Sequence, residues 1–303
     1  MAAERRMKVG VVLPIADEDD RQPGYREIRE IALAAERTGL DSVWVFDHLL
    51  YRLEGEESGL HEAWTILAAI AEATTRVELG TIVMATSFRN PALQAKMAAT
   101  LDEVSGGRLI LGLGCGWHDP EYEAYGYPTD HRVGRFEEAL RIITDLIRTG
   151  RADFDGRWHT ARDCVLLPPA PRPDLPILVA AKRPRMLDLT VRHADAWNTA
   201  WYGMPDERFA ANLGSLRDAC ERADRDPGSI TLTVGLTIRG PAEGGSSSEA
   251  TSSIPADPPA IAAALDAYEA HGIDHVICVL EPTTPAMVEQ LAVGVRRWRP
   301  AIG

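Results

Sequence analysis

Asp47 and His48 follow directly on the apolar segment Ser42–Phe46, which has the composition of a buried strand. An imidazole at the end of a strand can titrate near neutral pH and exchange a proton with a bound substrate. The alternative is that His48 only caps the strand end by a hydrogen bond, for example to Asp47. The sequence leaves both interpretations open, and His48 is the first candidate for a catalytic residue.

A glycine-rich run, Gly112–Gly116, lies at the end of the apolar segment Arg108–Leu113. It has no GK[ST] ending and no helix starts directly after it, so it is neither a Walker loop nor a dinucleotide-binding turn. Small residues at this place would let a flat ligand approach the backbone closely. Tight packing at the rim of the fold would explain the same residues equally well.

Three basic residues, Lys182, Arg183 and Arg185, precede and open a predicted helix. Positive side chains and free N–H groups at a helix N-terminus favour a phosphate or carboxylate ligand. A solvated, salt-bridged surface turn is the alternative. Lys182 is also the only lysine at a predicted strand end, so a Schiff-base lyase that uses its amine is a second hypothesis for the function.

Aromatic side chains near the predicted strand ends could form the wall of an apolar substrate pocket, and packing within the loops is the alternative. They are Trp117, Tyr122, Tyr125, Tyr127, Trp197 and Trp201. Neither an H-x-H pair after the first strand nor an HExxH motif occurs, so we expect no metal site.

The segments that must position these residues alternate between strand and helix along the whole chain. Strands are expected at Val9–Leu13, Ser42–Phe46, Val77–Met84, Arg108–Leu113, Ile177–Ala181, Asp195–Asn198, Ile230–Ile238 and His275–Leu280. Helices are expected at Tyr25–Thr38, Glu62–Ala73, Pro91–Ser105, 136–147, Arg185–His193, Asp206–Ala223, Pro258–His271 and Thr284–Trp298.

This alternation predicts an α/β fold, a (β/α)8 TIM barrel with loop insertions at its C-terminal face. The segments Gly39–Val43 and Gly272–Val276 echo each other, each between a helix and a strand, as expected of equivalent units. A doubly wound open sheet is the alternative, but it usually has fewer strands and a glycine-rich first turn. In a barrel, one rim would hold Asp47, Gly114, Lys182 and Asn198.

Length and composition are typical of a single soluble globular domain, residues 1–303. With 45 acidic and 32 basic residues the net charge is −13, which disfavours a nucleic acid or an anionic membrane as partner. No run is long enough to span a membrane, and no signal peptide is recognised. The four cysteines form no C-x-x-C pair, so we expect free thiols and a cytoplasmic protein.

Two segments interrupt the alternation of strands and helices. The segment 115–132 is aromatic and is expected to be an irregular insertion. The segment 240–257 is rich in glycine, serine and alanine, and is expected to be a mobile loop after the seventh strand rather than a domain linker.

Several short motifs follow one another along the chain in a specific order. They are Asp47–His48, Leu79–Val83 with Phe88–Pro91, Gly112–Trp117, Gly134–Leu140, Phe154–Gly156 and Asp195–Asn198. In this order they resemble the bacterial luciferase-like superfamily, and most closely its deazaflavin F420-dependent oxidoreductases. The resemblance extends over roughly residues 8–200 and more loosely over the rest.

The resemblance implies a TIM barrel that binds reduced FMN or F420 at its C-terminal mouth, with His48 near the reactive ring and a cis peptide at Ile82–Val83. The phosphate loop would be Ala180–Arg185. The implied cofactor contacts are Thr81, Ile82, Val83, Thr86, Gly114, Cys115, Gly116, Ala180, Ala181, Lys182, Arg183 and Arg185. The expected substrate contacts are Asp47, Trp117, Asn198 and Trp201.

The chain departs from the family pattern at two places. The run after the fifth strand, Ala180–Pro184, is not glycine-rich, and Trp117 stands where sugar-phosphate dehydrogenases of this branch carry an acid. The resemblance therefore implies hydride transfer to, or monooxygenation of, a small and relatively apolar organic substrate. F420 is slightly favoured over FMN, because its longer anionic tail can use more than one cation. A non-catalytic flavin-binding relative is a further alternative, and a homodimer is possible.

Overall fold

The computed structural model describes residues 6–17, 21–53, 55–241 and 253–299. In these residues parallel strands form a closed barrel, in the order β1 (Lys8–Val12), β2 (Ser42–Val45), β5 (Glu78–Thr81), β7 (Leu109–Gly114), β10 (Ile177–Ala180), β11 (Ala196–Tyr202), β12 (Thr231–Arg239) and β14 (His275–Glu281). The ring closes because β1 pairs with both β2 and β14, and β7 pairs with β10. The predicted (β/α)8 barrel is confirmed, and the open-sheet alternative is wrong.

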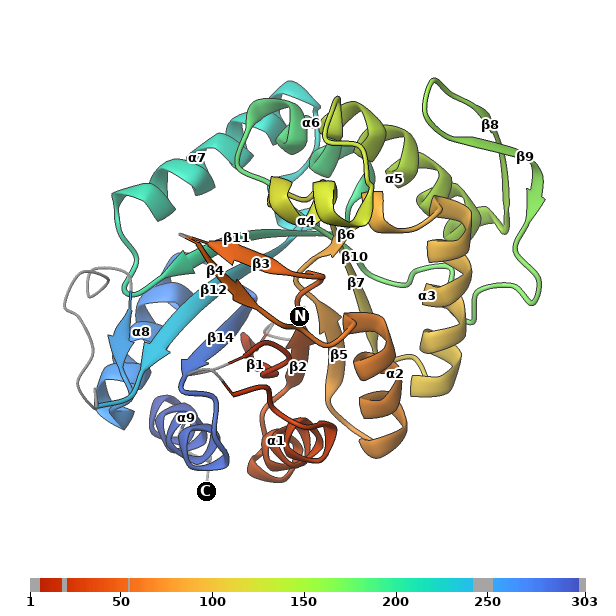
Figure 1. Cartoon of the computed structure of the whole chain (residues 1–303). Helices are drawn as coiled ribbons and strands as arrows, with labels where there is room; N and C mark the ends of the chain where they lie inside the picture. Colours follow the sequence, from red (N-terminus) through yellow and green to blue (C-terminus); the bar gives the residue numbers. More distant parts are fainter. Residues whose placement is uncertain (1–5, 18–20, 54, 242–252, 300–303) are drawn as a thin grey trace.

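Helices surround the barrel, as Figure 1 shows in a view along its axis. They are α1 (Tyr25–Thr38), α2 (Ala63–Ala73), α3 (Pro91–Ser105), α5 (Arg132–Thr149), α6 (Pro184–His193), α7 (Glu207–Arg222), α8 (Pro258–Ala270) and α9 (Pro285–Trp298). Each predicted helix is present. Glu62, Asp206 and Thr284, which we predicted as first helical residues, are N-caps, because their side chains accept backbone N–H groups of the first turn.

The echo between segments 39–43 and 272–276 has a structural cause. In both, the glycine ends the preceding helix in the left-handed conformation, with φ of 91° and 81°. The aspartate two residues later binds the start of a neighbouring strand. Asp41 accepts the N–H of Val9 in β1, and Asp274 accepts the N–H of Leu232 in β12, both at 2.8 Å. The repeated motif thus joins adjacent strands at the N-terminal end of the barrel.

The interior of the barrel is filled by side chains. Trp44 of β2 is fully buried. A Cβ on Gly80 of β5 would lie 2.0 Å from the Trp44 ring, and one on Gly10 of β1 would lie 2.8 Å from its Nε1. Glycines therefore flank the tryptophan on both neighbouring strands. Because the centre is packed, a ligand can reach only the ends of the barrel.

The predicted strand Val77–Met84 is interrupted. β5 ends at Thr81, and a separate short strand, β6 (Met84–Ala85), pairs with β7 further along. The peptide between Ile82 and Val83 is cis, as the resemblance implied. A 3-10 turn over Thr86–Phe88 follows β6 and leads into α3.

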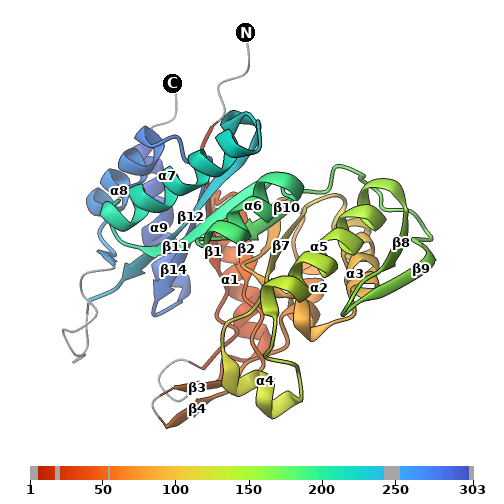
Figure 2. The ribbon, with the colours of Figure 1, turned by 90° about the horizontal axis from the view of Figure 1, so that it is seen from above.

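Three additions to the barrel were not predicted. The hairpin β3 (Tyr51–Leu53) and β4 (Glu56–Ser58) follows β2, and the hairpin β8 (Arg151–Asp155) and β9 (Thr160–Val165) follows α5. A short helix, α4 (Asp119–Tyr125), lies within segment 115–132, so the expectation of an irregular insertion is wrong for that part. Figure 2 shows the β3–β4 hairpin and α4 together at one end of the barrel. The β8–β9 hairpin lies at the periphery, outside α5 (Figure 1).

The predicted mobile segment 240–257 is described only at its two ends, since residues 242–252 lie outside the described part of the chain. Ile254 and Pro255 form β13, which pairs with β12, so this end of the segment is not a loop.

All four cysteines are free thiols, as predicted. Within the described residues, no helix has the length and apolarity needed to cross a membrane.

Candidate active site at the barrel mouth

His48 lies just beyond β2 and is bonded to a carboxylate from α4. Its Nδ1 lies 2.8 Å from Oε1 of Glu121, whose Oε2 accepts the backbone N–H of Leu49 at 2.8 Å. Glu121 is only 1% exposed. Burial raises the pKa of Glu121, but hydrogen bonds from the His48 ring and from backbone N–H groups outweigh this and hold it below its usual range. The carboxylate is therefore ionised between the ring and the backbone.

Aromatic rings lie around the other sides of His48. The ring centroid of Tyr51 in β3 is 4.5 Å from that of His48, and the centroids of Trp117 and Phe46 are at 5.5 and 6.1 Å. Trp117 is 59% exposed, which leaves it open to a ligand. Burial, with a contribution from the charge of Glu121, raises the pKa of Tyr51, so its phenol stays neutral. The surroundings of His48 are aromatic on these sides.

A second histidine, His118, joins the β3–β4 hairpin to the segment before α4. Its Nε2 accepts the backbone N–H of Arg52 in β3 at 3.0 Å, and the residue is 3% exposed. Its ring centroid lies 6.4 Å from that of His48 and 5.8 Å from that of Tyr51. This contact fixes the hairpin beside the His48 ring.

Asp47 binds an arginine and makes no hydrogen bond to His48, so the alternative that His48 caps the strand end through Asp47 is wrong. Arg89 donates to both carboxylate oxygens, at 2.7 and 3.1 Å, and the N–H of Ala85 donates at 3.0 Å. Arg89 also binds Glu62, the N-cap of α2. Burial alone would lower the pKa of Arg89, but the two carboxylates outweigh it and raise the pKa. Asp47, an expected substrate contact, is thus placed as a buried support of the loop that carries His48.

The glycines of β7 are required by contacts within the protein. A Cβ on Gly112 would lie 1.8 Å from the carbonyl oxygen of Thr81, and one on Gly114 would lie 2.5 Å from Cγ2 of Val83. The hydroxyl of Thr81 also donates to the Gly112 carbonyl at 2.9 Å and accepts its N–H at 2.8 Å. Packing therefore accounts for these glycines, and Thr81, an expected cofactor contact, is engaged between strands.

The other expected cofactor contacts near β6 and β7 differ in exposure. Ile82 and Thr86 are buried, and Thr86 donates to the carbonyl of Gly114 at 3.4 Å. Val83, Cys115 and Gly116 are partly exposed. Burial raises the pKa of Cys115, so its side chain is a neutral thiol.

The basic residues lie at the start of α6, on the rim of the barrel. Lys182 donates to the carbonyl of Ala200, and desolvation, together with the charge of Arg208, lowers the pKa of Lys182. Arg183 is exposed, is the N-cap of α6 and supplies no side-chain acceptor to its first turn. With the described residues the guanidinium of Arg183 makes no hydrogen bond or ion pair. Arg185 pairs with Glu137 at 2.8 Å, so its charge is partly compensated.

The predicted rim is confirmed for Asp47, which follows β2, for Gly114, which ends β7, and for Lys182, which follows β10. Asn198 is level with the end of β10 but lies inside the barrel, so its predicted place on the rim is wrong. Asn198 pairs with Ala180 and donates to Thr233 at 2.8 Å, and at 2% exposure it belongs to the interior of the barrel.

Trp201 lies further along β11 and is 36% exposed. Its ring packs so closely against β12 that a Cβ on Gly235 would lie 2.4 Å from it. The peptide between Ala200 and Trp201 is cis. Trp201 is therefore anchored on one face and open on the other.

Two aromatic side chains expected at a pocket wall belong to packed regions of the protein. Trp197 is fully buried and donates to the carbonyl of Ala181 at 2.8 Å. Tyr122 is also fully buried, packs on Phe88 with ring centroids 5.0 Å apart and donates to the carbonyl of Cys115. For these two, the packing alternative is correct.

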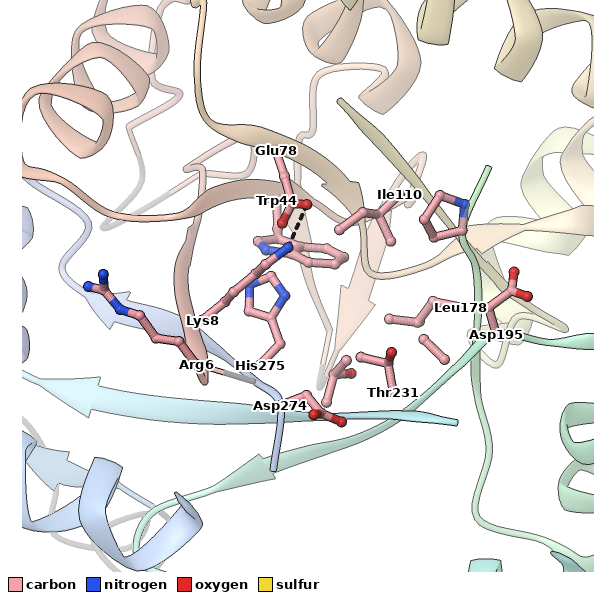
Figure 3. Close-up of a pocket in the computed structure, with 13 residues that line it drawn as sticks. Arg6, Lys8, Trp44, Glu78, Ile110, Leu178, Asp195, Thr231, Asp274 and His275 are labelled. Carbon is pink, nitrogen blue, oxygen red and sulfur yellow. Dashed lines mark hydrogen bonds and ion pairs between the residues drawn. The ribbon is translucent and has the colours of Figure 1, made fainter. Parts of the chain in front are cut away.

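A separate cavity of about 170 Å³ lies at the other end of the barrel, where the strands begin. Figure 3 shows Lys8 bonded to Glu78 in this cavity, beside Trp44 and His275. His275 is 3% exposed and its Nε2 lies 2.7 Å from the Ser42 hydroxyl. No predicted site residue lines this cavity, so it is distinct from the His48 region. The described residues contain no cluster of three or more potential metal ligands.

The sequence analysis assigned no role in the site to Glu121, Tyr51, His118 and Arg89, although Arg89 lies within the motif Phe88–Pro91. Glu121 lies 73 positions from His48, and Arg89 lies 42 positions from Asp47. No local spacing pattern connects residues so far apart. Segment 115–132 also contains Asp119, Glu123 and Asp130, so its local sequence does not distinguish Glu121 from the other acids.

Comparison with known proteins defines the class to which this chain belongs. Residues 7–239 match the family described as luciferase-like monooxygenase. Together with the barrel and the His48 site, this match shows that the chain belongs to that family, as the order of its motifs indicated.

Two relatives and one solved structure show how far the similarity extends. The chain is 33% identical to the F420-dependent glucose-6-phosphate dehydrogenase of Amycolatopsis mediterranei (strain U-32). The match extends over 224 residues, which cover 72% of this chain and 66% of the relative. It is 30% identical to the pyrimidine monooxygenase RutA of Enterobacter sp. (strain 638). This match extends over 243 residues, which cover 75% of this chain and 66% of the relative. The matched region thus spans just under two thirds of each relative.

The solved structure is an F420-dependent secondary alcohol dehydrogenase in complex with an F420–acetone adduct. It superimposes with a TM-score of 0.79 at 17% identity, over 97% of this chain and 99% of that chain. At this identity the likeness concerns the fold.

Proposed function

We propose that the protein is an oxidoreductase that uses reduced F420 or FMN for hydride transfer to, or monooxygenation of, a small and relatively apolar organic substrate. The observation that carries the proposal is the placement of His48, bonded to buried Glu121 and surrounded by aromatic rings, on the same rim as the basic start of α6. Relatives of this chain named as F420-dependent dehydrogenase and as monooxygenase support both reaction types.

The start of α6 fits the phosphate that both cofactors carry. No side chain caps this helix terminus, so its first N–H groups are available to an anion. Lys182 and Arg183 add positive charge where a helix dipole disfavours cations, which suggests that an anionic ligand offsets them. A chain of net charge −13 needs such local compensation to bind an anion. Lys182, Arg183 and the partly exposed Val83, Cys115 and Gly116 would hold the cofactor.

When bound, the reduced cofactor supplies the hydride or the electrons for the reaction. The chain itself supplies His48, which would give or take a proton at Nε2, and the rings of Tyr51, Trp117 and Trp201, which would exclude water and orient an apolar substrate. We favour F420 over FMN, because a longer anionic tail can use Arg183 as well as Lys182.

The test is titration of the protein with each cofactor, before and after removal of the two cations. We expect the double variant Lys182→Ala/Arg183→Ala to bind at least about tenfold more weakly, because charge-assisted contacts contribute about 1.5–3 kcal/mol each. The matched control is Arg296→Ala/Arg297→Ala, two adjacent exposed arginines at the end of α9. If both double variants bind each cofactor with equal affinity, the proposal that α6 holds the phosphate is wrong.

Two other functions have distinct outcomes. A non-catalytic relative would bind reduced cofactor and leave every electron acceptor unchanged. A Schiff-base lyase would form a covalent adduct at Lys182 with a carbonyl substrate and borohydride, and Lys182→Ala would abolish it. Sedimentation equilibrium decides between a monomer and a homodimer, because a mass of 33.1 kDa would indicate a monomer.

A further inference from the structure

We propose that Glu121 is a positioning residue for His48: it holds the ring by Nδ1 and so keeps Nε2 as the atom that exchanges a proton at the mouth. The inference rests on the proposed function for the role of His48 itself. The arrangement of the two side chains can be tested without any cofactor or substrate.

Each carboxylate oxygen of Glu121 has a different hydrogen-bond partner. Oε2 accepts the N–H of Leu49, which fixes the backbone next to His48, and Oε1 faces Nδ1 of the ring, both at 2.8 Å. A carboxylate that is 1% exposed must have such partners, because burying an unpaired charge is costly. The carboxylate therefore orients both the ring and the loop that carries it.

An ionised carboxylate can only accept hydrogen bonds, so Nδ1 of His48 must carry the proton in this contact. In the neutral ring, Nε2 is then an acceptor, and in the charged ring it is a donor. Nε2 makes no hydrogen bond with the described residues. During turnover a proton enters or leaves at Nε2, while the proton on Nδ1 stays hydrogen-bonded to Glu121, which remains a carboxylate throughout.

The groups that face His48 make Glu121 its electrostatic partner. Tyr51 from β3 is a neutral phenol, and Phe46 and Trp117 carry no charge. His118 accepts a backbone N–H at Nε2, which requires a neutral acceptor nitrogen. Among these described neighbours only Glu121 is anionic, and a negative neighbour favours the protonated imidazole. Removing its charge should therefore shift the pH dependence of proton transfer.

The first experiment determines the tautomer of His48 in the protein without cofactor. Histidine labelled with ¹⁵N reports, in long-range ¹H–¹⁵N spectra, which ring nitrogen carries the proton, and loss of a signal in His48→Gln identifies the residue. We expect the Nδ1–H form for His48 in the unmodified protein. The Nε2–H form would overturn the proposal, and this measurement needs no variant of Glu121 to fold.

The second experiment uses Glu121→Gln, with Glu123→Gln as the matched control on the exposed side of α4. In Gln an NH2 group replaces one of the two oxygens that face Leu49 and His48, and this group donates rather than accepts. With the oxygen kept by the N–H of Leu49, the NH2 group donates to Nδ1 of His48, so we expect the population of the Nε2–H tautomer to rise. We also expect kcat to fall by about 10²–10⁴-fold, the range for a lost general acid–base function. The pH profile of the rate should also change, because the charge beside the ring is lost.

Cofactor affinity should be unchanged in both variants, and Glu123→Gln should retain parental turnover and pH profile. If Glu121→Gln keeps the parental tautomer and pH profile, Glu121 only supports the fold and the proposal is wrong. If instead the parent protein binds neither cofactor, the proposed function fails, while the tautomer measurement still decides the relation between Glu121 and His48.

Discussion

The two nitrogens of His48 differ in their partners, since Nδ1 is bonded to Glu121 whereas Nε2 makes no hydrogen bond with the described residues. We predict that His48→Ala lowers kcat by about 10²–10⁴-fold, because proton transfer at Nε2 is lost. Cofactor affinity should change little, because the phosphate site that we propose lies at α6, away from this ring. Stopped-flow turnover and fluorescence titration separate the two effects. Parental turnover across the pH range would make His48 a structural residue only.

The buried pair Asp47–Arg89 allows a second prediction for single residues. Arg89→Ala leaves the carboxylate of Asp47, 3% exposed, without its cation, and we expect a loss of about 3–5 kcal/mol in the free energy of unfolding. Arg52→Ala removes a comparable contact to Glu57, at 2.7 Å, between exposed side chains. That control should cost about 1 kcal/mol or less. Urea unfolding measures both, and equal losses would contradict the assignment of the Asp47–Arg89 pair as a buried support.

At the scale of elements, strand β7 and helix α7 each contain a glycine in different surroundings. Gly112→Ala would bring a Cβ within 1.8 Å of the Thr81 carbonyl, so we expect at least about 1–3 kcal/mol of destabilisation. Gly214 lies inside α7, and apart from the backbone of its own helix no described atom lies within 4 Å of its Cβ position, so Gly214→Ala should stabilise by about 0.5–1 kcal/mol. Thermal unfolding of the two variants should therefore shift in opposite directions. If Gly112→Ala leaves the thermal stability unchanged, β5 and β7 can move apart to fit the Cβ. The close approach of a ligand would then be the better explanation for this glycine.

At the scale of the whole molecule, the buried His275, at the end of the barrel where the strands begin, makes the stability of the fold depend on pH. Burial, helped by the positive charges of Lys8 and Arg299, lowers the pKa of His275 to about 3. The unfolded chain binds a proton at this histidine near its usual value of about 6.5, but the folded protein does not. Stability therefore falls as pH decreases from about 6.5 towards 3, by at most about 1.4 kcal/mol per pH unit from this group.

We predict that His275→Gln flattens the pH dependence of the free energy of unfolding between pH 6.5 and 4.5, a window that lies within these two values. His271→Gln, at an exposed histidine in the same part of the chain, is the control and should keep the parental slope. Urea unfolding at several pH values provides the comparison. A slope that His275→Gln leaves unchanged would mean that this histidine is protonated in the folded protein.

Most of the barrel could be predicted from the sequence because its signals are local. A parallel strand buried on both faces needs an uninterrupted apolar run, and β7 is buried at every position. Helix ends need capping groups within a few residues, which located α2, α7 and α9 to within one residue. The hairpin β8–β9 was not predicted, because most of its side chains are exposed and its sequence therefore has no apolar periodicity.

The sequence by itself thus determined the alternation of strands and helices, the family, and the rim on which His48 and the basic residues lie, because the C-terminal ends of parallel strands meet on one side of a barrel. Only the tertiary structure decided which side chains meet there. Glu121 reaches His48 across 73 positions and Arg89 reaches Asp47 across 42, through closure of the ring and docking of α4. Such contacts depend on distance in space between elements, which no local spacing of residues records.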